Sequence, residues 1–553
     1  MKKSKRKFLL FLGLLSLFLL SLFLSESLDS TKLENIDSRE ELVNSFQTNY
    51  GISLEIDGDF KSNLEPLVIS PDVQIGTLEN ALKEHYKGDF NCREYQKAEK
   101  GKEINDEKSI KEYCSRYSGT KQIFFVKALI LGVFMLVFWI FEIIPVFVTA
   151  LFPIVFGPIL GLIQFDQLAM SYGNQNVFLF LGGFILALGL EKWKVHDQIT
   201  SRILFYVGNS PNKILFGFIV STALLSMWIS NTATSLMMLP IALSVIGTMQ
   251  NKSSNSNFAL VLLLAIAYSA NIGGLATLVG SPPNVQMAGI VEQQFGLEIT
   301  FWDWMRIGLP ISCVLLCILF LLFSFLLRKE STYEIQNSQE IRPWSKDQIH
   351  VMLVFLGVVV FWVFREPIIA ISGVEYKDLV PALVGSIVLF ILPNSDNKEP
   401  LMSWEDTRNL PWGILLLFGG GLALAKMLEL NGVVDQINGL LNFFSDWHIL
   451  VIIVILVAIT IFATEVMSNL ALVTLFIPIV AVFSRELNVD MEVLCFPVAI
   501  AASCAFMFPI ATPPNAVVFS TGKVSIRKMA IVGLLLNLIC IAVISLAVYY
   551  FLV

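Results

Sequence analysis

Charged residues are scarce in this sequence. Only 15% of its 553 residues are Asp, Glu, Lys or Arg, 55% are hydrophobic, and the mean hydropathy is +0.70. This balance excludes the soluble globular classes, and the net charge of −7 gives no sign of a basic surface for nucleic acid. Apolar stretches of the roughly 20 residues that a membrane helix needs recur along the chain. The sequence therefore predicts an all-α polytopic protein of the inner or plasma membrane, surrounded by lipid bilayer.

Histidine is rarer still. The four histidines fall outside every motif described below and form no metal or catalytic set. The apolar spans also contain no HExxH sequence, no paired aspartates and no serine with a histidine in a suitable pattern. We therefore expect neither an enzyme nor a bound cofactor.

The N-terminus is a basic heptapeptide followed by an apolar run that ends at residue 24. The run exceeds the h-region of about 7 to 15 residues in a cleaved signal peptide, so we interpret 1–24 as an uncleaved span, with cleavage as the alternative. Either interpretation makes 25–121 a polar extracytoplasmic insert. An oxidising compartment permits a disulfide between Cys92 and Cys114 in this insert, and two unrelated thiols are the alternative.

Two apolar segments, 212–247 and 448–483, are too long for one simple span and carry a polar tripeptide near the middle. We interpret each as a re-entrant hairpin whose turn lies inside the membrane, where irregular backbone must be buried in protein or line a watery cavity. The remainder divides into a first membrane repeat at 122–328, a cytoplasmic linker at 329–347 and a second repeat at 348–553.

An internal repeat supports this division. Four short sequences recur in the same order at an offset of roughly 220 to 240 residues, which indicates duplicated halves. Basic loops flank the first hairpin and follow the sixth span; if these are cytoplasmic, the hairpins enter from opposite sides and the halves are inverted. The recurring pairs are VFWIFE at 137–142 with VFWVFRE at 360–366, FLGG at 180–183 with LFGG at 417–420, SNT at 230–232 with SNL at 468–470, and SPPN at 281–284 with TPPN at 512–515.

The polar motifs contain almost no charge. No charged residue occurs in 258–290 or 493–522, and the second hairpin carries only Glu465. Each Pro-Pro pair must break its helix and free carbonyl groups, which suit a hard cation, and N-terminal N–H groups, which suit an anion. A divalent anion without countercharge would be very costly to bury, so we expect sodium ions to bind with it.

The motifs resemble the paired signatures of the divalent anion/sodium symporter family, which includes the INDY transporters. The resemblance extends from about residue 123 to the C-terminus and is carried by WISNTAT at 228–234, GSPPN at 280–284, TEVMSN at 464–469 and ATPPN at 511–515. It implies an inverted-repeat, elevator-type homodimer, with two re-entrant hairpins and two broken helices, that moves dicarboxylates, citrate or sulfate together with several sodium ions.

The resemblance also implies the site residues. The first sodium site would use Ser226, Ser230, Asn231 and the backbone of Gly280, and the second would use Thr464, Asn469 and the backbone of Met467 and Ala511. The anion would contact Ser230, Asn231, Thr232, Ser281, Ser468, Asn469, Thr512 and Pro513. Leu470 departs from the family pattern, because it stands where the second motif has a threonine.

We expect sodium-coupled symport of small divalent anions, most readily the C4-dicarboxylates succinate, malate and fumarate, or citrate. A sulfate carrier or a sodium-independent dicarboxylate exchanger on the same fold is the alternative. An ion channel fits less well, because these motifs converge within one chain instead of forming a ring of subunits. A single Ser-Asn-Thr sequence in an apolar helix more often hydrogen-bonds to its own helix or to a neighbouring helix than to a ligand.

Glu465 either braces its hairpin or contacts ions, whereas Glu142 and Glu366 lie near span ends and fit an interfacial position.

Overall fold

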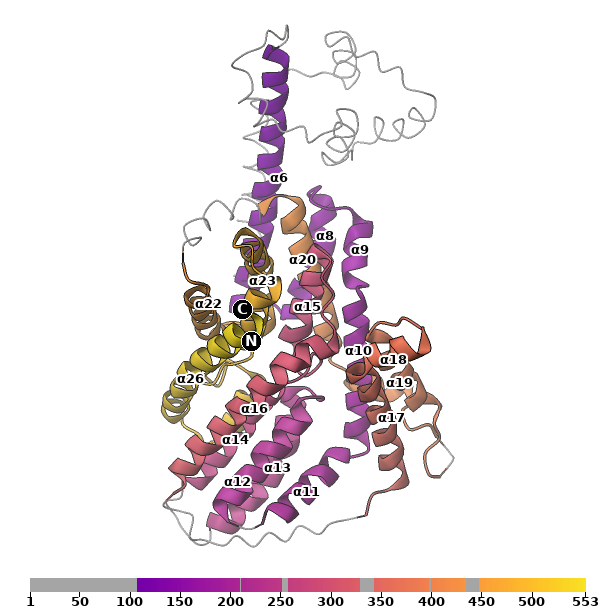
Figure 1. The fold of residues 1–553 in the computed structure, drawn as a ribbon, viewed down its shortest axis with the longest axis vertical. Coiled ribbons are helices and arrows are strands. Elements are labelled where there is room, and N and C mark those ends of the chain that lie inside the picture. Colours follow the sequence, from indigo (N-terminus) through magenta and orange to yellow (C-terminus); the bar gives the residue numbers. More distant parts are fainter. Residues whose placement is uncertain (1–106, 209, 251–256, 329–342, 397–398, 434–446) are drawn as a thin grey trace, which may run out of the picture. The chain divides into compact units, whose positions relative to one another are not determined.

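The structure is a computed structural model that describes residues 107–208, 210–250, 257–328, 343–396, 399–433 and 447–553. In these residues the regular structure is helical apart from an isolated β-bridge between Pro393 and Pro400, which confirms the all-α prediction. Figure 1 shows the order of the helices. The first span, most of the insert and most of the linker lie outside the described residues, as does the pairing of Cys92 with the Cys114 side chain.

The first half contains a helix pair at the predicted hairpin and a broken helix after it. The pair, α12 and α13, is separated by residues 227–230, and the broken helix, α14 and α15, by residues 274–281. The helices of this half are α6 (Glu107–Phe141), α7 (Val146–Thr149), α8 (Phe152–Ile159), α9 (Phe165–Tyr172), α10 (Gln175–Lys192), α11 (Val195–Val207), α12 (Pro211–Ser226), α13 (Asn231–Gln250), α14 (Phe258–Gly273), α15 (Pro282–Phe295) and α16 (Phe301–Leu326).

The second half repeats this order. Its helix pair, α22 and α23, is separated by residues 465–468, and its broken helix, α24 and α25, by residues 503–512. The elements of this half are α17 (Lys346–Val363), α18 (Arg365–Ser372), α19 (Leu379–Ile391), the 3-10 helix η1 (Trp404–Asn409), α20 (Trp412–Leu430), α22 (Ile449–Thr464), α23 (Asn469–Glu486), α24 (Met491–Ala502), α25 (Pro513–Phe519) and α26 (Ile526–Leu552).

The helix ends follow local sequence signals. Thr300 and Asp303 form a capping box at the start of α16, and Ser345 and Gln348 form one at the start of α17. Proline occupies the first turn of both α15 and α25, where its missing N–H costs no helical hydrogen bond. These signals explain why each broken helix resumes where it does.

Within the described residues, seven helices are long and apolar enough to cross a membrane. They support a multi-pass integral membrane protein. Shorter apolar helices of 10–17 residues include both helices of the first predicted hairpin and the first helix of the second. The seven are Ile123–Phe141, Phe165–Lys192, Phe301–Leu326, Lys346–Val363, Trp412–Leu430, Asn469–Glu486 and Ile526–Leu552.

The chain forms two compact units. In the smaller, the described residues are 107–134, 156–164 and 430–433; there Asn431 donates a hydrogen bond to the carbonyl of Leu162 at 3.0 Å. The larger unit contains both helix pairs and both broken helices. In it α12 and α13 pack on α14 (Figure 1), and α22 and α23 pack on α24, so that each helix pair lies against the broken helix of its own half.

Candidate ion and anion site

The turn of the first hairpin brings a hydroxyl and an amide together. Ser226 ends α12 and Asn231 begins α13, and the Ser226 Oγ lies 2.7 Å from the Asn231 Oδ1. The same hydroxyl lies 2.7 Å from the carbonyl oxygen of Ala270 in α14. Ser230 accepts a hydrogen bond from the Ala233 backbone N–H at 3.3 Å, so it caps α13. Both hydroxyls of the predicted first sodium site therefore lie at this turn.

The side-chain amide of Asn231 can take two orientations in this cluster, which exchange its oxygen and nitrogen. With its nitrogen turned inward, the two N–H groups of the amide can donate to acceptors among the carbonyl oxygens of Ala270 and Gly280, each 3.2 Å away, and the Ser226 Oγ, 2.7 Å away. With its oxygen turned inward, the cluster consists only of hydroxyl, amide and carbonyl oxygens. Such a set of neutral oxygens suits a hard cation such as sodium.

Two glycines make room for this cluster. A Cβ atom at Gly274 would lie 2.5 Å from the Asn231 Oδ1, and one at Gly280 would lie 2.7 Å from the Gly274 carbonyl oxygen. Real Cβ atoms do not approach other atoms so closely. Glycine at both positions therefore allows the loop between α14 and α15 to approach the hairpin turn.

The second hairpin reproduces the arrangement. Thr464 ends α22 and Asn469 begins α23, and the Thr464 Oγ1 lies 2.7 Å from the Asn469 Oδ1. The same hydroxyl donates to the carbonyl oxygen of Ala502 at 2.7 Å, as Ser226 does to that of Ala270. The agreement of distances in the two halves follows from the repeat in the sequence.

Each Pro-Pro-Asn motif is closed by its asparagine. The Asn284 Nδ2 donates to the carbonyl oxygens of Gly274 and Thr277 at 3.0 and 2.9 Å. The Asn515 Nδ2 donates to those of Ala505 and Phe508 at 3.0 and 3.1 Å. Both asparagines are fully buried, so these bonds satisfy carbonyl groups that the helix break releases.

The two halves are joined at the motifs. The Asn271 Nδ2 at the end of α14 donates to the Thr512 Oγ1 of the second half at 3.1 Å. The Ser503 Oγ after α24 lies 2.9 Å from the Ser281 Oγ of the first half. In addition, α13 packs on α25 and α15 packs on α23. Each hairpin thus meets the broken helix of the other half as well as its own.

The other predicted site residues lie at the same helix starts and turns. Thr232 and Ser468 are half-buried in the first turn of α13 and just before α23. Met467 lies in the second hairpin turn, and Ala511 is buried directly before Thr512. Pro513 is exposed at the first position of α25.

Comparison with known proteins identifies the family. A model of the citrate transporter family matches residues 136–491. The sodium-dependent dicarboxylate transporters SdcS of Staphylococcus saprophyticus and of Staphylococcus aureus strain USA300 are each 38% identical over 431 residues, which cover 74% of this chain and 83% of theirs. The chain belongs to the citrate transporter family. This confirms the resemblance to sodium-coupled anion symporters.

A solved structure, that of the YdaH transporter of Alcanivorax borkumensis, is 11% identical with a TM-score of 0.49, and the match covers 69% of this chain and 87% of that one. This likeness is too distant to add to the description of the fold.

In this citrate transporter family member, Glu465 braces the second hairpin. Its side chain is buried, and its Oε1 accepts hydrogen bonds from the backbone N–H groups of Phe506 and Met507 at 2.8 and 2.9 Å. The same oxygen accepts from the Asn537 Nδ2 at 2.8 Å, and the Oε2 accepts from the Phe508 N–H at 3.2 Å. The carboxylate thus ties the hairpin turn to the loop between α24 and α25. Glu142 and Glu366 are exposed.

Sequence reasoning missed several residues that build the site. Ala270 and Ala502 supply carbonyl oxygens beside the hydroxyls of Ser226 and Thr464. Asn271, Ser503 and Asn537 were also missed, because each binds a residue of a distant motif. Asn284 and Asn515 had a detectable signal, since they end the two Pro-Pro-Asn motifs at matching positions.

Replacing Glu465 with glutamine tests the bracing role. The amide nitrogen of glutamine cannot accept a hydrogen bond, so at least one of the four donors loses its acceptor, at a cost of about 1 to 3 kcal/mol. We expect Glu465→Gln to lower the unfolding temperature of the purified protein and to raise the sodium concentration that stabilises it half-maximally. Glu366→Gln, a change at an exposed carboxylate, is the matched control. Equal sodium dependence in the two variants would contradict the bracing role.

Proposed function

We propose that this protein is a sodium-coupled symporter of small divalent anions, with C4-dicarboxylates or citrate as substrates. The observation that carries the proposal is the pair of equivalent oxygen clusters at Ser226 and Asn231 and at Thr464 and Asn469, next to two broken helices. The names of the SdcS relatives, which are sodium-dependent dicarboxylate transporters, support both the ion and the substrate class.

We infer one sodium ion at each cluster. At the first, Ser226, Ser230 and Asn231 supply side-chain oxygens and Gly280 a carbonyl oxygen, to which we add the carbonyl of Ala270. At the second, Thr464 and Asn469 supply side-chain oxygens and Met467 and Ala511 carbonyl oxygens, to which we add the carbonyl of Ala502. The oxygens are neutral, so the affinity depends on how closely the loops hold them together.

The anion would bind between the clusters. Four helices, α13, α15, α23 and α25, begin at the four motifs. The N-terminal N–H groups of α13 and α23, which have no proline in their first turn, suit carboxylate oxygens. The proposed anion contacts are Ser230, Asn231, Thr232, Ser281, Ser468, Asn469, Thr512 and Pro513. None of these is a cation, so the bound sodium ions supply the countercharge and binding of ion and anion becomes cooperative.

We further propose an elevator-type movement in a homodimer. Both hairpins and both broken helices pack on one another across the two halves, so they can move as one body with the bound ions and anion. The family resemblance supports the movement and the dimer alike.

Uptake into proteoliposomes tests the function. We expect labelled succinate or citrate to accumulate only with an inward sodium gradient. Accumulation of sulfate in preference to both would favour a sulfate carrier on the same fold, and sodium-independent exchange against internal succinate would favour an exchanger. Either result would overturn the proposal of sodium-coupled dicarboxylate symport.

The two asparagines give a sharper test of the site. We expect Asn231→Ala and Asn469→Ala each to abolish sodium-driven uptake while membrane insertion persists, because each amide serves the ion and the anion at once. Asn212→Ala is the control, since Asn212 lies at the other end of α12 from the turn. If both site variants retain near-normal uptake with unchanged sodium dependence, the assigned site is wrong.

Leu470 tests the substrate contacts of the second hairpin. Its side chain is buried, whereas Thr232 in the first hairpin is half-buried. If position 470 faces the anion, Leu470→Thr adds a hydrogen bond to a charged group, worth on the order of 1.5 to 3 kcal/mol, or about a tenfold change in relative affinity. We therefore expect a changed ranking among succinate, citrate and sulfate.

Competition assays at saturating sodium measure this ranking, because the ratio between anions is independent of the amount of active protein. If leucine instead packs only against protein, threonine would lower every rate together. An unchanged ratio would mean that position 470 faces away from the substrate.

A further inference from the structure

Two groups of helices within the larger unit are distinguished by their packing. The hairpin group consists of α12 to α16 and α22 to α26, whose members pack on one another across both halves of the repeat. The support group consists of α10, α17, α18, α19 and η1; in it α19 packs on both α10 and α17. The two groups meet where α15 packs on α10 and where α16 packs on α17, and α11 connects them by packing on both α10 and α12. Movement of the hairpin group must change these contacts.

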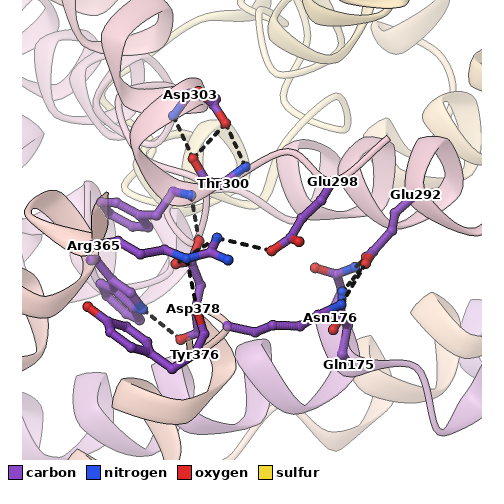
Figure 2. A network of polar contacts seen from close by, with 12 residues as sticks. Gln175, Asn176, Glu292, Glu298, Thr300, Asp303, Arg365, Tyr376 and Asp378 are labelled. Carbon is purple, nitrogen blue, oxygen red and sulfur yellow. Dashed lines mark hydrogen bonds and ion pairs between the residues drawn. The ribbon is translucent and has the colours of Figure 1, made fainter. Parts of the chain in front are cut away.

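A network of charged residues lies where the groups meet (Figure 2). The Arg365 Nη1 of α18 lies 3.0 Å from the Glu298 Oε1, in the connection between α15 and α16, and 3.7 Å from the Asp378 Oδ1. The Asp378 Oδ2, just before α19, accepts a hydrogen bond from the backbone N–H of Phe301 at 2.6 Å. Asp378 therefore binds the N-terminus of α16 from the other helix group.

Glu292 adds a second set of contacts across the same boundary. It lies in the last turn of α15 and accepts hydrogen bonds from the side-chain amides of Gln175 and Asn176 at the start of α10 (Figure 2), the latter at 2.8 Å. The Lys377 Nζ lies 3.4 Å from its Oε1. We call the whole set the Arg365 network; its members are Gln175, Asn176, Glu292, Glu298, Arg365, Lys377, Asp378 and the Phe301 N–H.

The charges of the network are complementary across the boundary. The hairpin group contributes the carboxylates Glu292 and Glu298. The support group contributes Arg365 and Lys377, together with the carboxylate of Asp378, whose charge Arg365 offsets. A pocket lined by residues from both sides opens beside them, and the Glu298 side chain is 37% exposed. Water can therefore replace part of the network when the groups separate, which limits the cost of breaking it.

An aromatic stack connects this network to the proposed transport site. The Phe301 ring lies between Trp362 of α17, with ring centroids 4.6 Å apart, and Trp228, with centroids 5.9 Å apart. Trp228 belongs to the first hairpin turn, two residues before Ser230. It also meets Phe355 of α17 edge to face at 5.1 Å. The residue whose N–H binds Asp378 thus also supports the hairpin turn.

We propose that the Arg365 network is a releasable lock between the hairpin group and the support group, and that it acts on the first hairpin turn through the stack of Phe301 on Trp228. The proposal rests on the elevator movement proposed above. In the present arrangement the lock is closed and the turn is held against α17. Release separates Glu292 and Glu298 from their partners and frees the turn to move with its bound ion.

A distance measurement in the full-length protein tests the lock. Spin labels at Leu297→Cys, in the connection between α15 and α16, and at Ile371→Cys, on α18, report the separation of the groups in lipid nanodiscs. Both positions are exposed, and the other accessible thiols are replaced by serine. We expect Glu298→Gln and Arg365→Gln each to add a longer-distance population. Glu298 is partly exposed, so its variant remains informative if Arg365→Gln fails to fold.

The control is Lys192→Gln. Lys192 pairs with Asp406 at 2.7 Å, but both residues belong to the support group, so loss of this pair should leave the distances unchanged. Unchanged distances in Glu298→Gln and Arg365→Gln would overturn the lock, as would an equal effect of Lys192→Gln. The measurement needs no transport, so a chain that moves no succinate still tests the lock, and failure of the lock leaves the uptake assays to decide the function.

Phe301 tests the link to the transport site. We expect Glu298→Gln to change succinate affinity by about threefold or more when residue 301 is phenylalanine or tyrosine, both of which keep the stack. In the Phe301→Leu background the same change should have no effect on affinity. Equal effects in all three backgrounds would show that the lock does not act through the stack.

The lock should also respond to pH. Burial raises the pKa of Asp378, which lies outside α19, to about 6 from 3.8, although the Phe301 N–H and Arg365 oppose the shift. Release exposes the carboxyl and returns its pKa toward 3.8, so the closed lock holds the proton more tightly and acid favours the closed state. The titratable groups that face Asp378 are Arg365, Glu298, Asp303, Glu292, Tyr376 and Lys377.

From pH 7 to pH 5 we expect the ratio of closed to released distances to rise about tenfold, and Asp378→Asn to remove most of this dependence. A ratio that falls with acid, or one that still changes tenfold in Asp378→Asn, would contradict the assigned role of Asp378.

Discussion

Each Pro-Pro pair begins the second part of a broken helix within an apolar span, and the asparagine that follows donates to two carbonyl groups of the loop before it. Proline cannot continue the hydrogen-bond ladder, and in a membrane the released groups have no water to bind. The asparagine side chains donate hydrogen bonds to some of these groups and so fix the shape of each loop. The proposed ion sites depend on that shape, because the carbonyl oxygens beside Asn231 come from the end of α14 and from the loop that Asn284 holds.

The two halves have the same backbone arrangement, but different side chains tie the hairpin turn to the loop of the broken helix. In the first half, the Thr277 hydroxyl donates to the Met227 carbonyl at 2.5 Å and ties the loop to the hairpin turn. In the second half, the Glu465 carboxylate does so through three backbone N–H groups. Of the two proposed ion sites, only the second therefore has a carboxylate held in its hairpin turn.

A continuous series of contacts connects the proposed lock to the proposed site. Asp378 binds the N-terminus of α16, Phe301 at that terminus stacks on Trp228, and Trp228 leads into Ser230. Aromatic rings transmit a displacement because they are rigid and closely packed. A change at the ion pairs can therefore reach the hairpin turn without an intervening flexible segment.

The sequence by itself determined the helical class, the repeat, the two interrupted helices and the positions of both hairpin turns. These features follow from local rules, since apolar length, proline and matching motifs act on neighbouring residues. Only the tertiary structure decided that Asn271 binds Thr512, that Ala270 and Ala502 supply carbonyl oxygens, and that Glu465 reaches Asn537. It also brought Arg365, Glu298 and Asp378 together. Such contacts join residues far apart in the chain, and the packing of whole helices, which no single motif encodes, sets them.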